Sequence, residues 1–262
     1  MKVLVTGNLG FIGSHLFKKL IESKIPVIGI DIINNDLNNP DICNIDSLDY
    51  KEITHVFHLA ASKFVHLSMQ DPETFIHNNC LGTCKIMQSF PNARIVNISS
   101  SSANEIKSIY GATKLFGEQM GIFHKNWLNL RLYNVFGEGQ SFVAVVPNFI
   151  KCRIENKSPT IYGDGCQERD LTYVGDVVEE LIRLMFNTKE TGLIHLGYSD
   201  SITINDLCDI LCPNIERIKV PIRDFDIVYS KSPTCMNITY GRTEGLKRTI
   251  EWYEKTYSRI SE

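Results

Sequence analysis

Three glycines near the amino terminus constrain the fold of this chain most strongly. Gly7, Gly10 and Gly13 follow a short apolar run and precede an amphipathic stretch that begins at Phe11. In a strand–loop–helix unit, the first glycine permits a tight turn, the second lets a phosphate approach the backbone, and the third lets the helix pack on the strand. Backbone N–H groups around Phe11 and Ile12 would face the anion from the positive end of the helix dipole. The chain therefore opens with a unit suited to bind a dinucleotide.

Short apolar runs alternate with amphipathic stretches through the first half of the chain. This pattern is typical of a parallel sheet with crossover helices. The expected strands are residues 2–6, 27–31, 55–58, 94–99 and 128–132, and the expected helices begin near Phe11, Pro72, Tyr110, Pro147 and Gly175. An asparagine-rich turn is expected at residues 34–39. We predict the α/β class, with a Rossmann-type doubly wound parallel sheet and a small C-terminal substrate lobe.

Asp31 bears on the choice between the two nicotinamide cofactors. It ends the second expected strand, 18 residues after Gly13. An acidic residue at this point binds the hydroxyls of the adenosine ribose, and its charge would repel a 2′-phosphate. The sequence therefore favours NAD over NADP. We assign residues 1–150 to an NAD-binding Rossmann domain, to which 170–196 return, and residues 151–262 mainly to a substrate-binding lobe.

A Tyr-x-x-x-Lys pair, Tyr110 and Lys114, follows a run of four serines at residues 99–102. On a helix the two side chains share one face, a turn apart. An isolated tyrosine titrates near pH ~10, and a nearby ammonium lowers its pKa by favouring the phenolate. The pair is typical of a general acid/base, with a serine hydroxyl to orient the substrate oxygen. Taken alone, the pattern fits a surface tyrosine and lysine equally well.

The bulk composition disfavours several classes of function. The chain has 262 residues, and its 43% hydrophobic and 22% charged content is ordinary for a soluble globular protein. A net charge of -3 gives no electrostatic reason to expect nucleic acid or a membrane surface. No apolar run approaches the roughly 18 residues of a membrane span. The eight cysteines include no Cys-x-x-Cys pair, so we expect reduced thiols, no metal site and a cytoplasmic protein.

Together these residues resemble the extended short-chain dehydrogenase/reductase family, in its nucleotide-sugar epimerase/dehydratase branch, which includes UDP-glucose 4-epimerase. The resemblance covers essentially the whole chain. Further motifs that carry it lie at residues 41–42, 55–61, 79–83, 131–137, 162–165, 169–176, 195–197 and 221–226. The order and spacing of these motifs, rather than any one of them, identify the family.

The resemblance implies roles for individual residues. Tyr110 is the catalytic acid/base, and Lys114 holds the nicotinamide ribose and lowers the pKa of Tyr110. The hydroxyl partner is Ser100, or Ser101 in the other register of the serine run. The residues implied to contact NAD are Gly7, Gly10, Phe11, Ile12, Gly13, Asp31, Asp41, Ile42, Leu59, Ala60, Ala61, Lys63, Asn79, Tyr110 and Lys114.

The same resemblance implies that Asn134, Arg169 and Arg223 bind the nucleotide diphosphate of the substrate. Guanidinium groups match diphosphate oxygens in geometry. Arg223 also fits a solvated surface charge, because Phe225 stands where relatives carry a glycine.

The implied activity is that of an NAD-dependent nucleotide-sugar epimerase, most simply a UDP-hexose 4-epimerase. The sugar would be oxidised at C4, would turn within the site, and would be reduced on its other face. A 4-keto-sugar reductase or a decarboxylase stays open. Dehydration is disfavoured, because family dehydratases carry an Asp-Glu pair where this chain has Ser101-Ser102 or, in the other register, Ser102-Ala103. A non-catalytic NAD-binding protein is the third hypothesis, since a fold alone does not prove activity.

Two further expectations follow from the resemblance. The loop at residues 101–109 is shorter than in relatives, which predicts a more open sugar pocket or a wall supplied by another segment or subunit. A homodimer is implied, with the helices from Pro72 and Tyr110 pairing into a four-helix bundle. The apolar residues Leu115, Phe116 and Met120 would face this bundle or, alternatively, only their own sheet.

Overall fold

The computed structural model describes residues 1–32, 41–47 and 52–260. The chain divides into two compact units, Met1–Leu132 with Val178–His195 (unit 1) and Tyr133–Val177 with Leu196–Glu262 (unit 2). The first boundary thus follows Leu132 instead of residue 150, and the segment that returns to unit 1 is shorter than 170–196. The turn expected at residues 34–39 lies outside the described residues.

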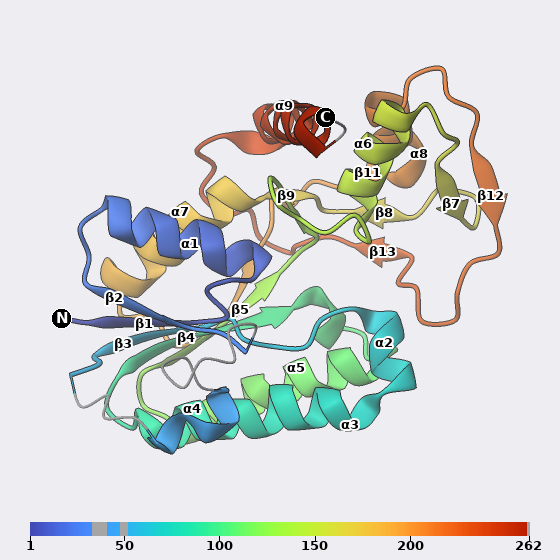
Figure 1. Cartoon of the computed structure of the whole chain (residues 1–262). Helices are drawn as coiled ribbons and strands as arrows, with labels where there is room; N and C mark the ends of the chain where they lie inside the picture. The colour runs from blue at the N-terminus through green and yellow to red at the C-terminus, as the bar shows by residue number, and fades with distance from the viewer. Residues whose placement is uncertain (33–40, 48–51, 261–262) are drawn as a thin grey trace. The chain divides into compact units, whose positions relative to one another are not determined.

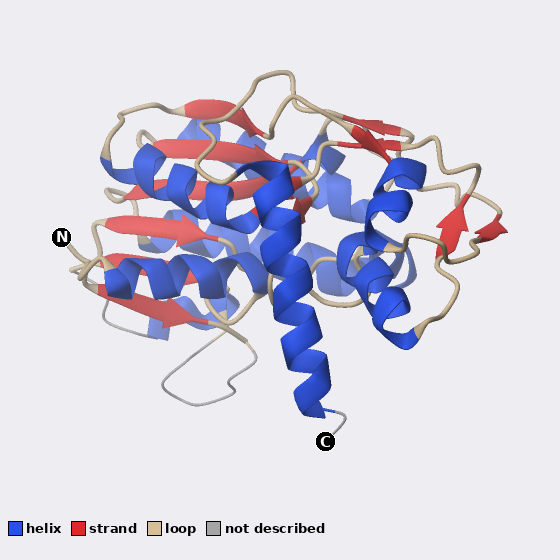
Figure 2. Cartoon of the chain, turned by 90° about the horizontal axis from the view of Figure 1, so that it is seen from above, coloured by secondary structure: helices blue, strands red, loops and turns tan. Residues whose placement is uncertain are grey.

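Unit 1 is built around a six-stranded sheet with the strand order β10-β5-β4-β3-β1-β2. Its strands are β1 (Val3–Thr6), β2 (Val27–Ile30), β3 (His55–His58), β4 (Arg94–Ser100), β5 (Trp127–Leu132) and β10 (Gly192–Leu196). The strands from β2 to β5 pair in parallel, and Figure 2 shows their arrows pointing the same way. Because β1 has β2 on one side and β3 on the other, the chain winds outward in both directions, and the predicted doubly wound sheet is confirmed.

Helices cover both faces of this sheet. In Figure 1, α1 (Phe11–Glu22) and α7 (Val174–Phe186) lie on one face, and α4 (Gly82–Ser89) and α5 (Ile109–Met120) lie on the other. The shorter elements of unit 1 are α2 (Val65–Gln70), α3 (Pro72–Phe75), the 3₁₀ turns η1 (Ile42–Ser47), η3 (Ser101–Ala103) and η4 (Gly121–Phe123), and the π-helix η2 (Ile76–Leu81). Because helices cover both faces, side chains on either side of a strand are buried, and Val3, Leu4 and Val5 are all fully buried. This explains why the sequence of β1 is a continuous apolar run.

The core on the α4 side of the sheet also fixes η1. Leu4, Val56 and Ile95 pack there with Ile86 of α4 in one buried cluster. Ile42 of η1 belongs to the same cluster, and its side chain occupies the place that a side chain on Gly82 would need. Packing of Ile42 against Gly82 therefore holds η1 beside α4.

The described residues of unit 2 form short strands and helices, together with the start of α7. The helices are α6 (Val145–Glu155), α8 (Ile204–Leu211) and α9 (Gly241–Ile260). The strands form the sheets β11-β8-β13, β12-β7 and β6-β9. Their bounds are β6 (Val135–Phe136), β7 (Thr160–Tyr162), β8 (Glu168–Arg169), β9 (Thr172–Tyr173), β11 (Ile202–Thr203), β12 (Ile218–Val220) and β13 (Tyr229–Ser230).

Two buried carboxylates organise unit 2. Asp170 accepts hydrogen bonds from the backbone N–H groups of Tyr198, Ser199 and Ser232. Asp176 accepts them from Thr239, Tyr240 and Gly241, at the start of α9, and from the Tyr198 hydroxyl. Both side chains are fully buried. The acidic positions of the 169–176 motif thus connect distant backbone segments of this unit, and neither makes the ion pair with Arg169 that its position in the sequence allows.

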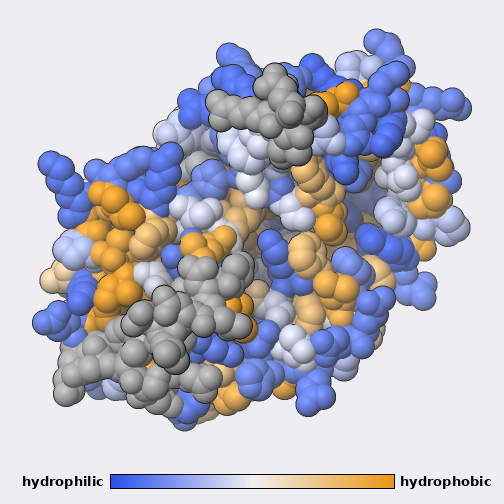
Figure 3. Space-filling model, in the orientation of Figure 1, coloured by the Kyte–Doolittle hydropathy of each residue, from blue (hydrophilic) through white to orange (hydrophobic). Residues whose placement is uncertain are grey.

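The surface is mixed in character. Figure 3 shows hydrophilic residues over much of the visible face, with apolar residues gathered in separate patches between them. Within the described residues, no helix is both long and apolar enough to cross a membrane.

Candidate active site

The backbone of the glycine loop approaches neighbouring backbone segments closely. Gly7 has a positive φ of 74°, and its N–H donates to Ile30 O at 2.7 Å. A Cβ atom on Gly7 would lie 2.8 Å from Ala60 N, and one on Gly13 would lie 2.0 Å from Gly7 O. Gly10 leaves more room, since its Cβ would approach only Gly7 O, at 3.2 Å. The first and third glycines are therefore required by close backbone approach.

The amino terminus of α1 is suited to receive a diphosphate. Gly10 caps the helix without a side chain, and the N–H groups of Phe11, Ile12 and Gly13 have no acceptor within the helix. Asp31, only 6% exposed, holds the loop, because its Oδ2 accepts the Leu9 N–H at 2.9 Å. These residues fit a dinucleotide, with backbone donors for phosphate and a carboxylate beside them.

The segment after β3 is fixed by Asn79, which projects from the π-helix. Its Oδ1 accepts the Ser62 N–H at 2.7 Å, and its Nδ2 donates to Ser62 O at 3.1 Å and to Thr113 Oγ1 at 3.0 Å. Thr113 in turn donates to Tyr110 O at 2.9 Å. The Asn79 amide therefore ties Ser62, in the segment after β3, to α5. π-Helices are frequent at functional sites.

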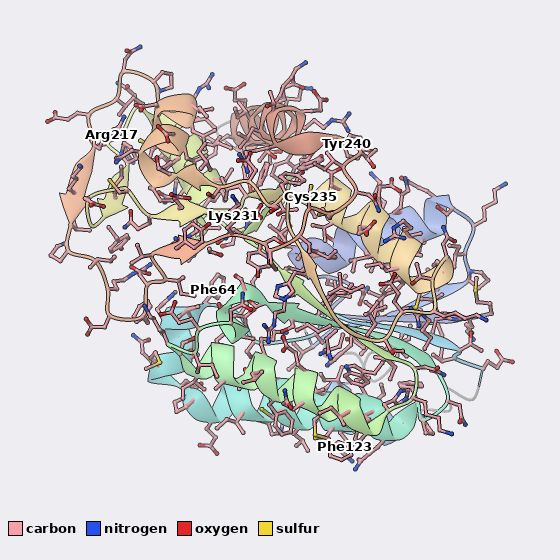
Figure 4. The ribbon with its side chains drawn as sticks, turned by 180° about the vertical axis from the view of Figure 1, so that it is seen from behind. Phe64, Phe123, Arg217, Lys231, Cys235 and Tyr240 are labelled. Atoms are coloured by element: carbon pink, nitrogen blue, oxygen red, sulfur yellow. The ribbon has the colours of Figure 1, made fainter. Side chains whose placement is uncertain are left out.

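Lys63 and Asp41 have local partners. The Lys63 ammonium lies 5.2 Å from the centre of the Phe64 ring, and Phe64 has an unusual positive φ of 81° at the start of α2 (Figure 4). A non-glycine residue in this region stores strain, which is often found near functional sites. Asp41 accepts the Cys43 N–H at 3.0 Å, and Ile42 beside it is buried in the core.

His58 lies at the end of β3 in a closed hydrogen-bond network. Its Nδ1 is 2.9 Å from Thr6 Oγ1, and its Nε2 is 3.0 Å from Thr83 Oγ1. Because the Thr83 hydroxyl donates to Asn79 O at 2.6 Å, it accepts from Nε2–H, and Nδ1 accepts from Thr6. Burial lowers the pKa of His58 to about 3, with the Lys114 charge as a smaller cause. His58 is therefore a packed strand-end residue, held neutral at physiological pH.

Tyr110 and Lys114 lie on α5, and the Tyr110 side chain hydrogen-bonds that of Ser100 at the end of β4. Ser101 begins the next turn, η3. Ser100 Oγ also accepts the Ser102 N–H at 3.2 Å. The Tyr110 backbone N–H donates to the buried Ser68 Oγ at 3.1 Å, which fixes the start of α5. Of the two registers of the serine run, the geometry therefore favours Ser100 as the hydroxyl partner.

The electrostatics of this pair differ from the sequence expectation. The Lys114 ammonium donates to Ile98 O at 2.8 Å and lies 6.0 Å from the centre of the Tyr110 ring. Burial lowers the pKa of Lys114 to about 8. The pKa of Tyr110 is raised, because burial outweighs its hydrogen bond to Ser100. The predicted lowering of the Tyr110 pKa is thus wrong, since desolvation of the phenolate is the dominant effect.

The three predicted substrate residues all lie in unit 2. Asn134, with a positive φ of 28°, donates to Ser230 Oγ at 3.2 Å, and Ser230 is the strand partner of Arg169. Arg169 donates to Glu168 O at 2.9 Å and to Val228 O at 3.3 Å. Burial lowers the pKa of Arg169.

Arg223 is held on three sides. Its guanidinium donates to both oxygens of Asp226, at 3.0 and 2.8 Å. The group lies 4.2 Å from the centre of the Tyr162 ring and 5.0 Å from that of Phe225. Phe225, the departure from the family pattern, therefore packs against the arginine, and Arg223 is not the freely solvated charge that this departure allowed.

Some residues around the pair were not anticipated from the sequence. Ser62 and Thr113 give no signal that distinguishes them from other hydroxyl residues. Glu118 does, since it follows Lys114 by four positions and so belongs to the same helix face. Among the described residues, no group of three or more His, Cys, Asp or Glu side chains is arranged to hold a metal ion.

Comparison with known proteins gives a consistent result. Residues 3–197 match the NAD dependent epimerase/dehydratase family. A proposed UDP-glucose 4-epimerase of Methanocaldococcus jannaschii is 30% identical, with 95% of this chain and 97% of that protein covered. The crystal structure of a UDP-glucose 4-epimerase with UDP-glucose, from Thermotoga maritima, superposes with a TM-score of 0.89 at 26% identity, covering 98% and 100% of the two chains. The protein MoeE5, in complex with UDP-glucose and NAD, superposes with a TM-score of 0.85 at 28% identity, with the same coverage.

Proposed function

The chain belongs to the NAD dependent epimerase/dehydratase family, and on that premise we propose that it interconverts the C4 epimers of a UDP-hexose. It is an NAD-dependent enzyme, as the sequence predicted. The choice of epimerisation and of a UDP-sugar is supported by the relatives named as UDP-glucose 4-epimerases.

In this proposal Tyr110 is the acid/base. Its phenolate oxygen takes the proton of the sugar 4-hydroxyl and later returns it, while Ser100 would hold the same oxygen through a hydrogen bond. When bound, NAD would supply the redox chemistry, as the acceptor and later the donor of the C4 hydride. Lys114 supplies a positive charge one helical turn away. This charge favours the phenolate form of Tyr110, which accepts the proton of the sugar hydroxyl. The placement of Tyr110 and Lys114 a turn apart on α5, with Ser100 at the end of β4 interacting with the Tyr110 side chain, is the observation that carries this assignment.

The remaining predicted residues have binding roles. The α1 terminus and Asp31 would hold the diphosphate and the adenosine ribose of NAD, and the Asn79 network would shape the strand end beside them. Arg169 and Arg223 would bind the diphosphate of the UDP-sugar, for which Arg223 must exchange its Asp226 partner. Guanidinium groups form such paired contacts with phosphate as readily as with carboxylate.

A panel assay tests the activity. The purified protein is mixed with NAD and, separately, with UDP-hexoses and UDP-hexuronates, and the sugars are followed by NMR. We expect the 4-epimer to appear from at least one of them. Net consumption of NADH with a 4-keto sugar would identify a reductase instead, and loss of carbon dioxide from a uronate would identify a decarboxylase.

The variant Tyr110→Phe tests the role of the hydroxyl. We expect turnover to fall by about 10²–10⁴-fold, the usual contribution of a general acid/base, with NAD affinity retained. Tyr253→Phe is the matched control, because it also removes a buried tyrosine hydroxyl but lies in unit 2. Full activity in Tyr110→Phe would contradict the proposal, as would NAD binding with no conversion of any sugar.

We also propose a homodimer formed through the α5 side of unit 1. Several apolar side chains on neighbouring elements are exposed there, namely Ile76, Leu81, Phe116, Ile122 and Phe123. Phe123, which is 78% exposed, follows α5 directly (Figure 4). Contiguous exposed apolar surface often marks an interface. Light scattering on a size-exclusion column should give twice the mass of 29.8 kDa, and Phe116→Glu should halve it, whereas Phe116→Leu should not.

A cytoplasmic location is part of the proposal. All eight cysteines are free thiols in the structure, which fits a reducing compartment.

A further inference from the structure

A buried carboxylate extends the Tyr110–Lys114 face of α5 by one more turn. Glu118 lies four residues after Lys114 and eight after Tyr110, so the three side chains lie along one side of the helix. Glu118 is only 6% exposed. The acid/base pair is therefore followed, on the same face, by a charge that is removed from water.

Two strands of the sheet hold this carboxylate. Arg131 of β5 donates from Nε to Oε1 at 2.6 Å and from Nη2 to Oε2 at 2.5 Å. Ser99 of β4 donates to Oε1 at 2.5 Å. Ser99 and Arg131 are direct partners in the parallel ladder, so their side chains reach α5 from adjacent points of the sheet. Arg131 is itself oriented by a hydrogen bond to Asn104.

Stability alone does not explain this arrangement. A buried ion pair costs so much desolvation that well-packed apolar residues often replace it without loss. The two donors of the Arg131 guanidinium and the Ser99 hydroxyl, however, together fix the position of the Glu118 carboxylate. A charge fixed in this way acts on its neighbours with little screening, because water is excluded.

The neighbour on which it acts is Lys114. Burial lowers the pKa of Lys114, and the Glu118 charge is the largest opposing influence, followed by Cys80 of η2. The other titratable groups around Lys114 are Tyr110 on its own helix and His58 of β3. Glu118 and Arg131 also act on His195 of β10. Among these groups, Glu118 is the carboxylate whose position is fixed by hydrogen bonds from Arg131 and Ser99.

We propose that Glu118 is a positioning residue for the acid/base pair, whose clamped carboxylate keeps the half-buried Lys114 side chain charged at the pH of the cell. Without it, the desolvated lysine would lose its proton more readily and would cease to favour the Tyr110 phenolate. The effect of the Lys114 charge on Tyr110 rests on the proposed function, whereas the effect of Glu118 on the charge of Lys114 does not.

The protonation of Lys114 can be measured without turnover. The full chain is labelled with lysine carrying ¹³C at Cε, and the Lys114 signal is identified by its absence from Lys114→Ala. The wild-type signal should titrate with a midpoint of about 8. In Glu118→Gln, which keeps the shape of the side chain, the midpoint should fall by roughly one pH unit or more. Glu118→Asp, which keeps the charge, should move it less.

A double variant guards against misfolding. Glu118→Gln with Arg131→Gln removes both buried charges together, and its midpoint should also lie below the wild-type value. An unchanged midpoint in Glu118→Gln or in the double variant would overturn the inference. In an active enzyme, the alkaline limb of kcat should move to lower pH with the same variants, which a purely structural role would not cause. A lowered midpoint in a protein with no epimerase activity would instead contradict the proposed function and leave the role of Glu118 standing.

Discussion

At the scale of single residues, the neutral histidine at the end of β3 makes stability depend on pH. The pKa of His58 falls from 6.5 in the unfolded chain to about 3 in the folded protein. Between these values the unfolded state binds the additional proton, so stability is lost as the pH falls below 6.5. At about 1.36 kcal/mol per pH unit, His58 should remove roughly 2–3 kcal/mol from the free energy of unfolding between pH 7 and 4.5.

Urea unfolding at the two pH values measures this loss. His58→Gln cannot take up the proton, so its unfolding free energy should differ less between pH 7 and 4.5 than that of the wild type. His66→Gln, at the half-buried His66 of α2, is the control and should keep the wild-type dependence. An equal dependence in His58→Gln and the wild type would mean that His58 accepts its proton without unfolding.

For single residues of the site, the sequence predicts which side chains come together but not their pKa values. Tyr110 and Lys114 are recognisable from their spacing, because a helix brings them to one face. The direction in which the Tyr110 pKa shifts cannot be recognised from the sequence, because it depends on how much water the folded chain excludes from the phenol. The choice of Ser100 within four consecutive serines likewise depends on where β4 ends, which sequence periodicity fixes only to within a few residues.

At the scale of an element, the glycine loop depends on contact between backbones. In Gly13→Ala the new Cβ would lie 2.0 Å from Gly7 O, which forces α1 away from β1. We expect the variant to lose roughly 1–3 kcal/mol of stability, the usual cost of overpacking, and to bind NAD weakly. Calorimetric titration with NAD and urea unfolding measure the two effects.

Gly10→Ala is the matched control for this prediction. Its Cβ would approach Gly7 O at 3.2 Å, so a shift of a few tenths of an ångström accommodates it. Stability should therefore fall less than in Gly13→Ala. Equal stability losses in the two variants would show that the loop is not held by the close Gly7–Gly13 approach.

Elements with a strong local pattern were predicted well. Each of the five expected strands lies within one residue of its observed bounds, and each expected helix begins within two residues of its predicted start. The exceptions depend on tertiary contacts. The π-helix η2 carries no local signal, and it follows α3 because the Asn79 amide bridges Ser62 and Thr113. The start of α9 is held by Asp176, which lies 65 residues away in the sequence, so no window of sequence reveals it.

At the scale of the whole molecule, the predicted residues divide between the two units. The glycine loop, Asp31, Asn79 and the acid/base pair belong to unit 1, and the three residues expected to bind the sugar nucleotide belong to unit 2. The sequence predicted this order along the chain because a doubly wound fold places its cofactor motif first. It did not predict that the chain leaves unit 1 at Leu132 and returns at Val178, since that depends on which face each later helix covers.

The central claim is that C4 is oxidised and reduced within one site, with the same hydrogen returned. The most direct test uses the UDP-hexose on which the enzyme is active, synthesised with deuterium at C4 and incubated with enzyme and NAD in ordinary water. We predict that NMR of the 4-epimer finds the deuterium retained at C4. An epimer that carries solvent hydrogen at C4 would contradict the account, because it would require removal of that hydrogen as a proton and not its transfer to NAD.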